Sequence, residues 1–329
     1  MSKKYDVVAL GELLIDFTEN AVSSQGNPLL EANPGGAPCN VLAMLTKLDK
    51  KCAFIGKVGN DMFGNQLKAA IEEVGIESRG LVMDENVHTT LAFVHTMENG
   101  DRDFSFYRKP GADMMLSANE IDLELINNCK VFHFGSLSMT DPVCKEATVK
   151  ALEEAKKAGA FITFDPNLRE PLWDSLDMAK EQIAYGMSMC HMLKISDNEI
   201  TWFTGIDDYD KAIEFLRNKY PNIRLLLLSL GKDGSRAYTA KHNAFASAFV
   251  RNDTVETTGA GDTFCGCIIN YVLDCIDKNI EIEDLDDNSI YEMLRFANAA
   301  ASIITTKKGA LRVMPNRSEV EASLKVNAL

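Results

Sequence analysis

Residues 256–264 read Glu-Thr-Thr-Gly-Ala-Gly-Asp-Thr-Phe and join a turn of small residues to the start of a helix. The helix is predicted by apolar residues that recur at every fourth position, namely Phe264, Ile268, Val272 and Ile276. At a helix start the backbone N–H groups lack partners within the helix, and the helix dipole adds partial positive charge. Because Gly259, Ala260 and Gly261 have little or no side chain, an anion such as a phosphate can approach these N–H groups.

Asp262 lies in the first turn of this predicted helix. A carboxylate beside a phosphate cradle can take the proton from a hydroxyl that attacks a terminal phosphate, which is the positioning that phosphoryl transfer requires. Asp is also a common residue at helix N-caps, so plain capping is the alternative. The stretch therefore predicts either a phosphoryl-transfer site or a capped helix.

The composition is typical of an ordinary folded protein. The chain has 329 residues, of which 46% are hydrophobic and 25% charged, enough for a sizeable core in one or two domains. Its net charge of -14 argues against nonspecific binding to nucleic acid or to anionic membranes, because the field of the protein repels phosphate. Since no apolar run is long enough to cross a bilayer and the first residues lack a signal-peptide core, we expect a cytoplasmic protein.

Short apolar runs alternate with helical periods along the chain. The runs are residues 7–10, 52–55, 131–134, 161–164, 191–195 and 225–230. Runs of this kind are typical of strands that are covered on both faces. Helix starts are indicated between them by Asp61 and by Asp141, which Pro142 follows. This order predicts an α/β fold with a doubly wound, mostly parallel sheet flanked by helices and with functional loops at the carboxyl ends of its strands.

Two segments interrupt this alternation. Residues 17–33 are polar and contain Gly26 and Pro28, whereas residues 89–107 alternate like a hairpin around a turn at Asn99-Gly100. We expect the two segments to join into a small β lid that excludes water, with two unrelated surface excursions as the alternative. The predicted division is a core of residues 1–16, 34–88 and 113–329 and a lid of residues 17–33 and 89–112. Exposed lid edges can pair with a second subunit, which would give a homodimer.

Two further features place polar residues or glycines at the ends of predicted elements. Asp16 comes after the first strand, where a carboxylate can accept hydrogen bonds from two neighbouring sugar hydroxyls. Residues 35–40 read Gly-Gly-Ala-Pro-Cys-Asn and precede an apolar helix. Gly35 and Gly36 allow the backbone to lie against a ligand, and Asn40 can both donate to and accept from a hydroxyl. Each feature taken alone also fits a simple turn.

Three further boxes lie at predicted strand ends. Residues 164–173 include Arg169, which can bind phosphate or sugar oxygens, although an ion pair with Asp165 is the alternative. Residues 194–199 lead from a strand into a helix, and residues 229–234 end the most apolar strand in a glycine turn; either box can flank nucleotide phosphates. The P-loop pattern Gly-x-x-x-x-Gly-Lys-Ser/Thr is absent, which excludes a P-loop kinase.

Together these boxes resemble the ribokinase-like (PfkB) carbohydrate kinases, and they are most similar to the fructokinases. The resemblance covers essentially the whole chain, through residues 11–16, 35–40, 56–64, 107–113, 164–169 and 258–262. It implies that Asp262 is the catalytic base and that Gly259, Ala260 and Gly261 form an anion hole. It places around the sugar Asp16, Gly35, Gly36, Asn40, Arg108, Asp113 and Arg169. It places around the nucleotide Ser196, Glu199, Ser229, Gly231, Gly234 and Asn298, with Glu199 acting indirectly on magnesium.

The resemblance implies an ATP- and Mg²⁺-dependent kinase that converts D-fructose to D-fructose 6-phosphate, with a sugar and ATP as its small-molecule partners. Kinases of another sugar, such as 2-keto-3-deoxygluconate or ribose, and a sugar-binding regulator without turnover are the alternatives. Two residues depart from the family pattern. Glu256 stands where members often carry Asp, close to a possible monovalent-cation site, so activation by K⁺ is less secure than dependence on Mg²⁺. Cys267 replaces a small residue and is expected to affect helix packing only.

Overall fold

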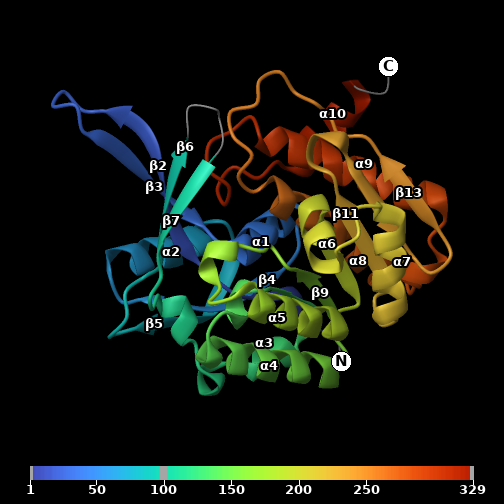
Figure 1. Cartoon of the computed structure of the whole chain (residues 1–329), viewed down its shortest axis with the longest axis horizontal. Helices are drawn as coiled ribbons and strands as arrows, with labels where there is room; N and C mark the ends of the chain where they lie inside the picture. The colour runs from blue at the N-terminus through green and yellow to red at the C-terminus, as the bar shows by residue number, and fades with distance from the viewer. Residues whose placement is uncertain (1–2, 97–101, 327–329) are drawn as a thin grey trace.

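The computed structural model describes residues 3–96 and 102–326, and its centre is a nine-stranded sheet (Figure 1). The strand order is β13-β12-β11-β10-β9-β8-β1-β4-β5, in which β12 runs antiparallel to its neighbours β11 and β13 and the other pairs are parallel. The strands are β1 (Tyr5–Leu10), β4 (Cys52–Gly59), β5 (Ile76–Asp84), β8 (Cys129–Gly135), β9 (Phe161–Asp165), β10 (Met192–Ser196), β11 (Leu225–Ser229), β12 (Ser235–Tyr238) and β13 (Asn243–Ala246). All six predicted strands are present, and the doubly wound, mostly parallel sheet is confirmed.

Ten α-helices lie in the described part of the chain. They are α1 (Ala37–Lys47), α2 (Met62–Glu73), α3 (Leu123–Asn127), α4 (Pro142–Lys157), α5 (Leu176–Met189), α6 (Asp197–Thr204), α7 (Tyr209–Lys219), α8 (Ala260–Asp277), α9 (Asp287–Ile304) and α10 (Arg317–Val326). The predicted starts of α2 and α4 are confirmed, because the carboxylates of Asp61 and Asp141 cap them. Among these helices none is long and apolar enough to cross a bilayer.

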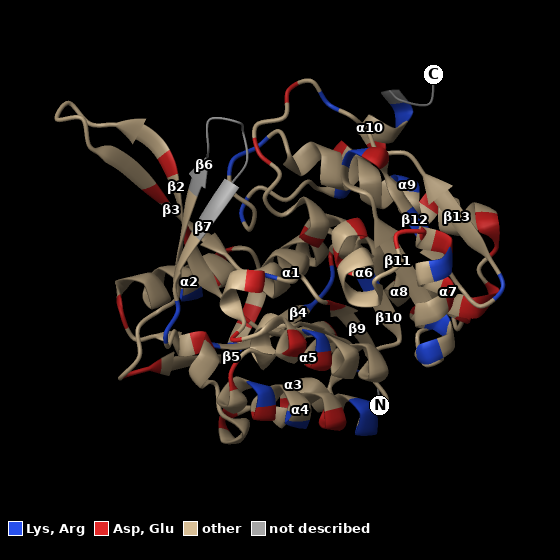
Figure 2. Cartoon of the chain, viewed as in Figure 1, with Lys and Arg blue, Asp and Glu red and all other residues tan. Residues whose placement is uncertain are grey.

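The two faces of the sheet bury separate apolar cores because side chains alternate along each strand. On β1, Val7 and Ala9 pack with α1, α2, α8 and α9, whereas Val8 and Leu10 pack with α3 to α7. Figure 1 shows α3, α4 and α5 together on one side of the sheet. On the surface, residues of both charge signs occur along α4 and α7 (Figure 2). All eight cysteines are buried free thiols.

The two segments that interrupt the α/β alternation lie in one four-stranded sheet of order β3-β2-β6-β7. Its strands are β2 (Leu14–Val22), β3 (Pro28–Gly35), β6 (Leu91–Thr96) and β7 (Arg102–Tyr107). The β2–β3 hairpin projects from the body of the molecule (Figure 1). Phe17 stacks on Phe93 at 4.9 Å between ring centroids and meets Phe63 of α2 edge-on, so aromatic packing joins this sheet to the core. The expected turn at Asn99-Gly100 lies outside the described residues.

The sheet begins inside the body of the molecule, because β2 starts at Leu14 and β3 ends at its partner Gly35, and both of these residues are buried. Among the residues of this sheet whose burial is described, the large apolar side chains that are exposed are Val22, Leu29, Leu30 and Tyr107. The division into a core and a lid, with the boundaries given above, stays a prediction.

Candidate active site

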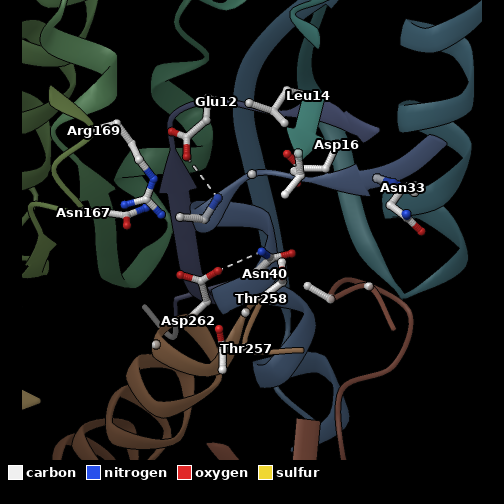
Figure 3. A pocket seen from close by; sticks show the side chains of 18 of the residues that line it. Glu12, Leu14, Asp16, Asn33, Asn40, Asn167, Arg169, Thr257, Thr258 and Asp262 are labelled. Atoms are coloured by element: carbon white, nitrogen blue, oxygen red, sulfur yellow. Dashed lines mark hydrogen bonds between the residues drawn. The ribbon is translucent and has the colours of Figure 1, made fainter. Parts of the chain in front are cut away.

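A cavity of about 350 Å³ lies where the start of α8 meets α1, the loop after β9 and the inner end of β2 (Figure 3). Sequence motifs that are distant along the chain converge on it. Of the residues predicted to form the site, those that line the cavity are Asp16, Gly36, Asn40, Arg169, Glu256, Gly259, Gly261 and Asp262. The cavity thus brings together Gly259 and Gly261 of the predicted phosphate cradle and four of the residues expected around a sugar.

The turn before α8 requires glycine at position 259. Gly259 is the N-cap of α8 with a φ of 76°, a left-handed conformation that strains other residues. A Cβ added there would also lie 2.8 Å from the Cβ of Ala310. The first intrahelical hydrogen bond runs from Thr263 N–H to the Gly259 carbonyl at 2.8 Å. Ala260 does not line the cavity, and its N–H donates to the carbonyl of Thr257 at 3.2 Å, so Gly259 and Gly261 are the two of the three predicted cradle residues that line it.

Asp262 faces the cavity from the first turn of α8 (Figure 3). The helix has no side-chain cap, which excludes the capping alternative for this residue. Burial raises the pKa of Asp262, while a hydrogen bond from Asn40 and the charges of Lys194 and Arg169 oppose the rise. A carboxylate with a raised pKa is a stronger base than an exposed one, as proton abstraction requires.

Asn40 contacts Asp262 directly: its Nδ2 donates to Asp262 Oδ2 at 2.8 Å. The Asn40 side chain is buried in α1, and within the described part of the chain its Oδ1 has no partner. The sequence predicted that this amide faces a substrate hydroxyl. In the structure its donor is used to orient the carboxylate of Asp262.

Asp16 lies on β2 across the cavity from Arg169 (Figure 3). Burial raises the pKa of Asp16 to about 7; the charge of Arg169 opposes this rise, and the charges of Asp262 and Glu256 add to it. Gly35 is not among the lining residues, but a Cβ there would overlap Asp16 Oδ2. Gly35 therefore makes room for the Asp16 carboxylate.

Arg108 and Asp113 do not line the cavity, although the family resemblance implies that they lie around the sugar. They form a buried ion pair in which Arg108 Nε is 2.7 Å from Asp113 Oδ2. Arg108 also donates to Thr140 Oγ1 at 2.9 Å and to the carbonyl of Leu137 at 3.0 Å. Since Leu137 itself lines the cavity, the pair supports the wall of the site from behind.

The residues predicted around the nucleotide lie at the same sheet edge but outside this cavity. Ser196 and Ser229 are paired neighbours at the ends of β10 and β11. Gly231 and Gly234 both have positive φ in the turn after β11. Asn298 on α9 is buried and accepts from Ser235 Oγ at 2.9 Å. Its Nδ2 donates to the carbonyl of Ala246 at 3.0 Å, so the side chain ties α9 to the antiparallel strands.

Both carboxylate oxygens of Glu199 are engaged within the protein. Oε2 accepts from Ser196 N and Oγ, each at 2.8 Å, and Oε1 accepts from Leu168 N at 2.7 Å. Nowhere in residues 3–96 and 102–326 do three or more acidic, Cys or His side chains form a group that could hold a metal. Because both Glu199 oxygens already accept hydrogen bonds from the protein, this carboxylate fits contact with a metal ion through water, which Mg²⁺ usually retains among its ligands.

Glu256 lines the cavity beside a second backbone segment. Its Oε1 accepts from Gly309 N at 2.9 Å, and its N–H donates to the carbonyl of Thr305 at 3.1 Å. The turn before α8 and residues 305–310 are therefore in contact, as a cation site built from the backbone of both would need.

Two charged residues that line the cavity, Glu12 and Lys194, were not predicted individually as site residues, although Lys194 begins the 194–199 segment that was predicted to flank nucleotide phosphates. Glu12 Oε1 accepts from Ala37 N at 3.0 Å, and burial raises the pKa of Glu12 to about 7. Lys194 interrupts the apolar run of β10, and a single charged residue inside a buried strand was the signal that could have identified it.

Comparison with known proteins gives a consistent result. The family model described as pfkB family carbohydrate kinase matches residues 4–317. The chain is 42% identical to the probable fructokinase-2 of Arabidopsis thaliana over 326 residues, which cover 97% of this chain and 96% of the relative. A fructokinase of Xylella fastidiosa with bound ATP is 29% identical and superposes with a TM-score of 0.89, covering 98% of this chain and 99% of that one.

A fructokinase double mutant of Vibrio cholerae O395, in a form with bound fructose, ADP and potassium ion, is 25% identical with a TM-score of 0.84, and the match covers 98% of this chain and 100% of that one. The family match spans nearly the whole sequence, and the relatives agree with it in both sequence and fold. The chain therefore belongs to the pfkB family of carbohydrate kinases.

Proposed function

We propose that this protein is a fructokinase, which transfers the γ-phosphoryl group of ATP to the 6-hydroxyl of D-fructose. The observation that carries the proposal is the position of Asp262, which shares one cavity with the start of α8 and with Asp16. The fructokinase relatives in plants and bacteria support the choice of sugar.

In the proposed reaction, Asp16 and Arg169 bind the sugar from opposite sides of the cavity. Asp262 accepts the proton of the 6-hydroxyl as the sugar oxygen bonds to the γ-phosphorus. The bond from that phosphorus to the bridging oxygen of ADP breaks, and the backbone amides at Gly259 and Gly261 stabilise the transferred charge. Arg108 and Asp113 act through the cavity wall and make no direct contact with the sugar.

The cofactors of the proposal are ATP and Mg²⁺, with K⁺ as an activator. Mg²⁺ bound to the nucleotide would neutralise phosphate charge, and Glu199 would act on it through water. Potassium would bind near Glu256 through backbone carbonyls of the two segments that meet there. For the nucleotide we propose the edge marked by Ser196, Ser229 and the turn after β11. Dimerisation through the exposed apolar residues of β2, β3 and β7 and a cytoplasmic location remain predictions.

A coupled assay of ADP release over a panel of sugars tests the function. Fructose should give the highest kcat/KM, and 2-keto-3-deoxygluconate and ribose should be poor acceptors. Higher activity with either of these sugars would transfer the assignment to that substrate. Saturable binding of fructose without release of ADP from ATP would instead identify a sugar-binding regulator.

Asn40→Ala should lower kcat about tenfold and shift the acid limb of the pH profile to higher pH. The hydrogen bond from Asn40 lowers the pKa of Asp262, so its loss raises that pKa further and leaves less of the base ionised at a given pH. The measurement is kcat against pH between 5 and 9. Asn270→Ala, which removes a buried amide of α8 outside the cavity, is the matched control. An unshifted acid limb in Asn40→Ala would contradict the orienting role.

Gly35→Ala should raise the KM for fructose about tenfold with little change in kcat. The added methyl group would occupy the space of Asp16 Oδ2 and displace that carboxylate. Steady-state kinetics of this variant, of Asp16→Asn and of the double variant form a cycle. If Gly35 acts through Asp16, the methyl group has no further effect once the carboxylate is gone; additive effects would show that it acts elsewhere.

A further inference from the structure

Lys194 is a buried cation that faces the cavity. It lies on β10, is 7% exposed, and is among the residues that line the site. A lysine is seldom so buried, because removing an ammonium group from water costs several kcal/mol unless it is paired. The position of this charge therefore needs an explanation.

The partner of Lys194 is Asp165, which is 4% exposed at the end of the neighbouring strand β9. Lys194 Nζ lies 2.9 Å from Asp165 Oδ2 and 3.2 Å from Oδ1. An ammonium group has three donors. Asp165 is the hydrogen-bond acceptor that the described residues provide for this nitrogen, so at least one donor is left for a ligand.

The remaining side of the ammonium group faces the start of α8. A Cβ added to Gly261 would lie 3.4 Å from Lys194 Nζ, which is the nearest described heavy atom outside the adjoining residues and the backbone of α8 itself. The absence of a side chain at Gly261 thus leaves the cation beside the first turn of the helix. Lys194 and the Gly261 backbone of the proposed phosphate cradle therefore lie close together and both line the cavity.

A fixed positive charge has a clear use at this place. The cavity is lined by four acidic residues, which are Glu12, Asp16, Glu256 and Asp262. Arg169 and Lys194 are the basic residues among those that line it, and Arg169 is exposed. A helix start supplies only about half an elementary charge. A phosphoryl group entering this acidic cavity therefore gains most from the buried ammonium.

We propose that Lys194 donates a hydrogen bond to an oxygen of the phosphoryl group in transfer and that Asp165 holds its ammonium in place. This inference rests on the proposed function. Lys194 keeps its proton throughout, since the proton of the sugar hydroxyl goes to Asp262. The contact strengthens as charge develops on the transferred oxygens, so it lowers the barrier more than it tightens binding of the sugar.

Lys194→Met tests the proposal, with Lys57→Met as the matched control. Lys57 is also 7% exposed and is paired with Asp84 and Glu120, each at 2.8 Å, but it does not line the cavity. Both variants remove a buried, paired ammonium and should lower the melting temperature. Only Lys194→Met should lower kcat, by about 10² to 10³, the loss seen when one donor to a developing oxyanion is removed.

Binding provides a readout that a structural role would not move. Fructose alone should bind Lys194→Met within threefold of the wild type. ADP with aluminium fluoride and fructose, a mimic of the phosphoryl group in transfer, should bind it at least 30-fold more weakly. Lys194→Gln keeps a neutral donor, so its affinity for this mimic should lie between those of the wild type and of Lys194→Met. Turnover of Lys194→Met equal to that of Lys57→Met, or an equal loss of fructose binding, would overturn the proposal.

The two proposals fail in different ways. If the wild type shows no turnover with fructose yet binds ADP with aluminium fluoride much more tightly than Lys194→Met does, the choice of sugar is wrong and the role of Lys194 stands. If the wild type turns over fructose and the Lys194 variants do so equally well, the function stands and the role of Lys194 is wrong.

Discussion

Asp262→Asn should lower kcat by about 10³ to 10⁴ while the fold and the affinity for fructose are retained. The amide has nearly the shape of the carboxylate and can still accept from Asn40 Nδ2, so the packing of α8 against α1 is preserved. It cannot take the proton of the attacking hydroxyl. The measurement is a single-turnover assay with saturating ATP and fructose, together with fructose binding and the melting temperature.

Asp274→Asn is the control for this prediction. Asp274 lies on the same helix α8 and pairs with Lys50 at 2.9 Å near the surface, away from the cavity. Loss of this ion pair should change turnover less than twofold, because the pair lies outside the cavity and partly exposed ion pairs contribute little to stability. Near-normal turnover in Asp262→Asn would remove the base from the mechanism, and with it the central argument for phosphoryl transfer at this cavity.

Asp16→Asn should raise the KM for fructose by about 100-fold and at the same time raise the melting temperature by a few degrees at pH 8. The first effect follows because an ionised carboxylate forms strong hydrogen bonds with two hydroxyls, whereas an amide offers one acceptor. The second effect follows from linkage. Burial raises the pKa of Asp16 to about 7, so ionising it costs stability in the folded state.

The destabilising effect of Asp16 ionisation depends on pH. Below the pKa of the unfolded chain, Asp16 is protonated in both states and does not affect stability through ionisation. As pH rises toward 7, the unfolded chain ionises first and the folded protein loses stability, a loss that the neutral Asn does not suffer. Thermal unfolding of both proteins from pH 4 to 8 should show a difference that grows with pH. A pH-independent difference would mean that Asp16 is not held in this costly state.

The main sheet could be predicted because its strands are buried on both faces and therefore appear as continuous apolar runs. The strands that were not predicted, β5, β12 and β13, have mixed patterns: β13 alternates exposed and less exposed residues at the edge of the sheet. Their pairing depends on contacts with neighbouring strands rather than on their own composition. That tertiary contribution is what a local pattern does not contain.

The centre of the site could be predicted for a related reason. Asp16, Asn40 and Asp262 each follow a glycine-containing or strand-end pattern, and parallel strands bring such ends to one edge. The roles of Asn40 and Arg108 could not be predicted, because a polar side chain near a site can face a ligand or another residue. Asn40 faces Asp262, and Arg108 faces Asp113. Only the three-dimensional distances distinguish these cases.

Strand β2 carries Asp16 near its inner end and Val22 at its outer end, in the hairpin that projects from the molecule. Because Asp16 is paired with Asn33 of β3 and Ala92 of β6, an outward movement of the inner part of this sheet would carry the carboxylate away from the sugar. The same movement would then open the entrance of the cavity and weaken binding of the sugar, so product release would need no separate conformational change.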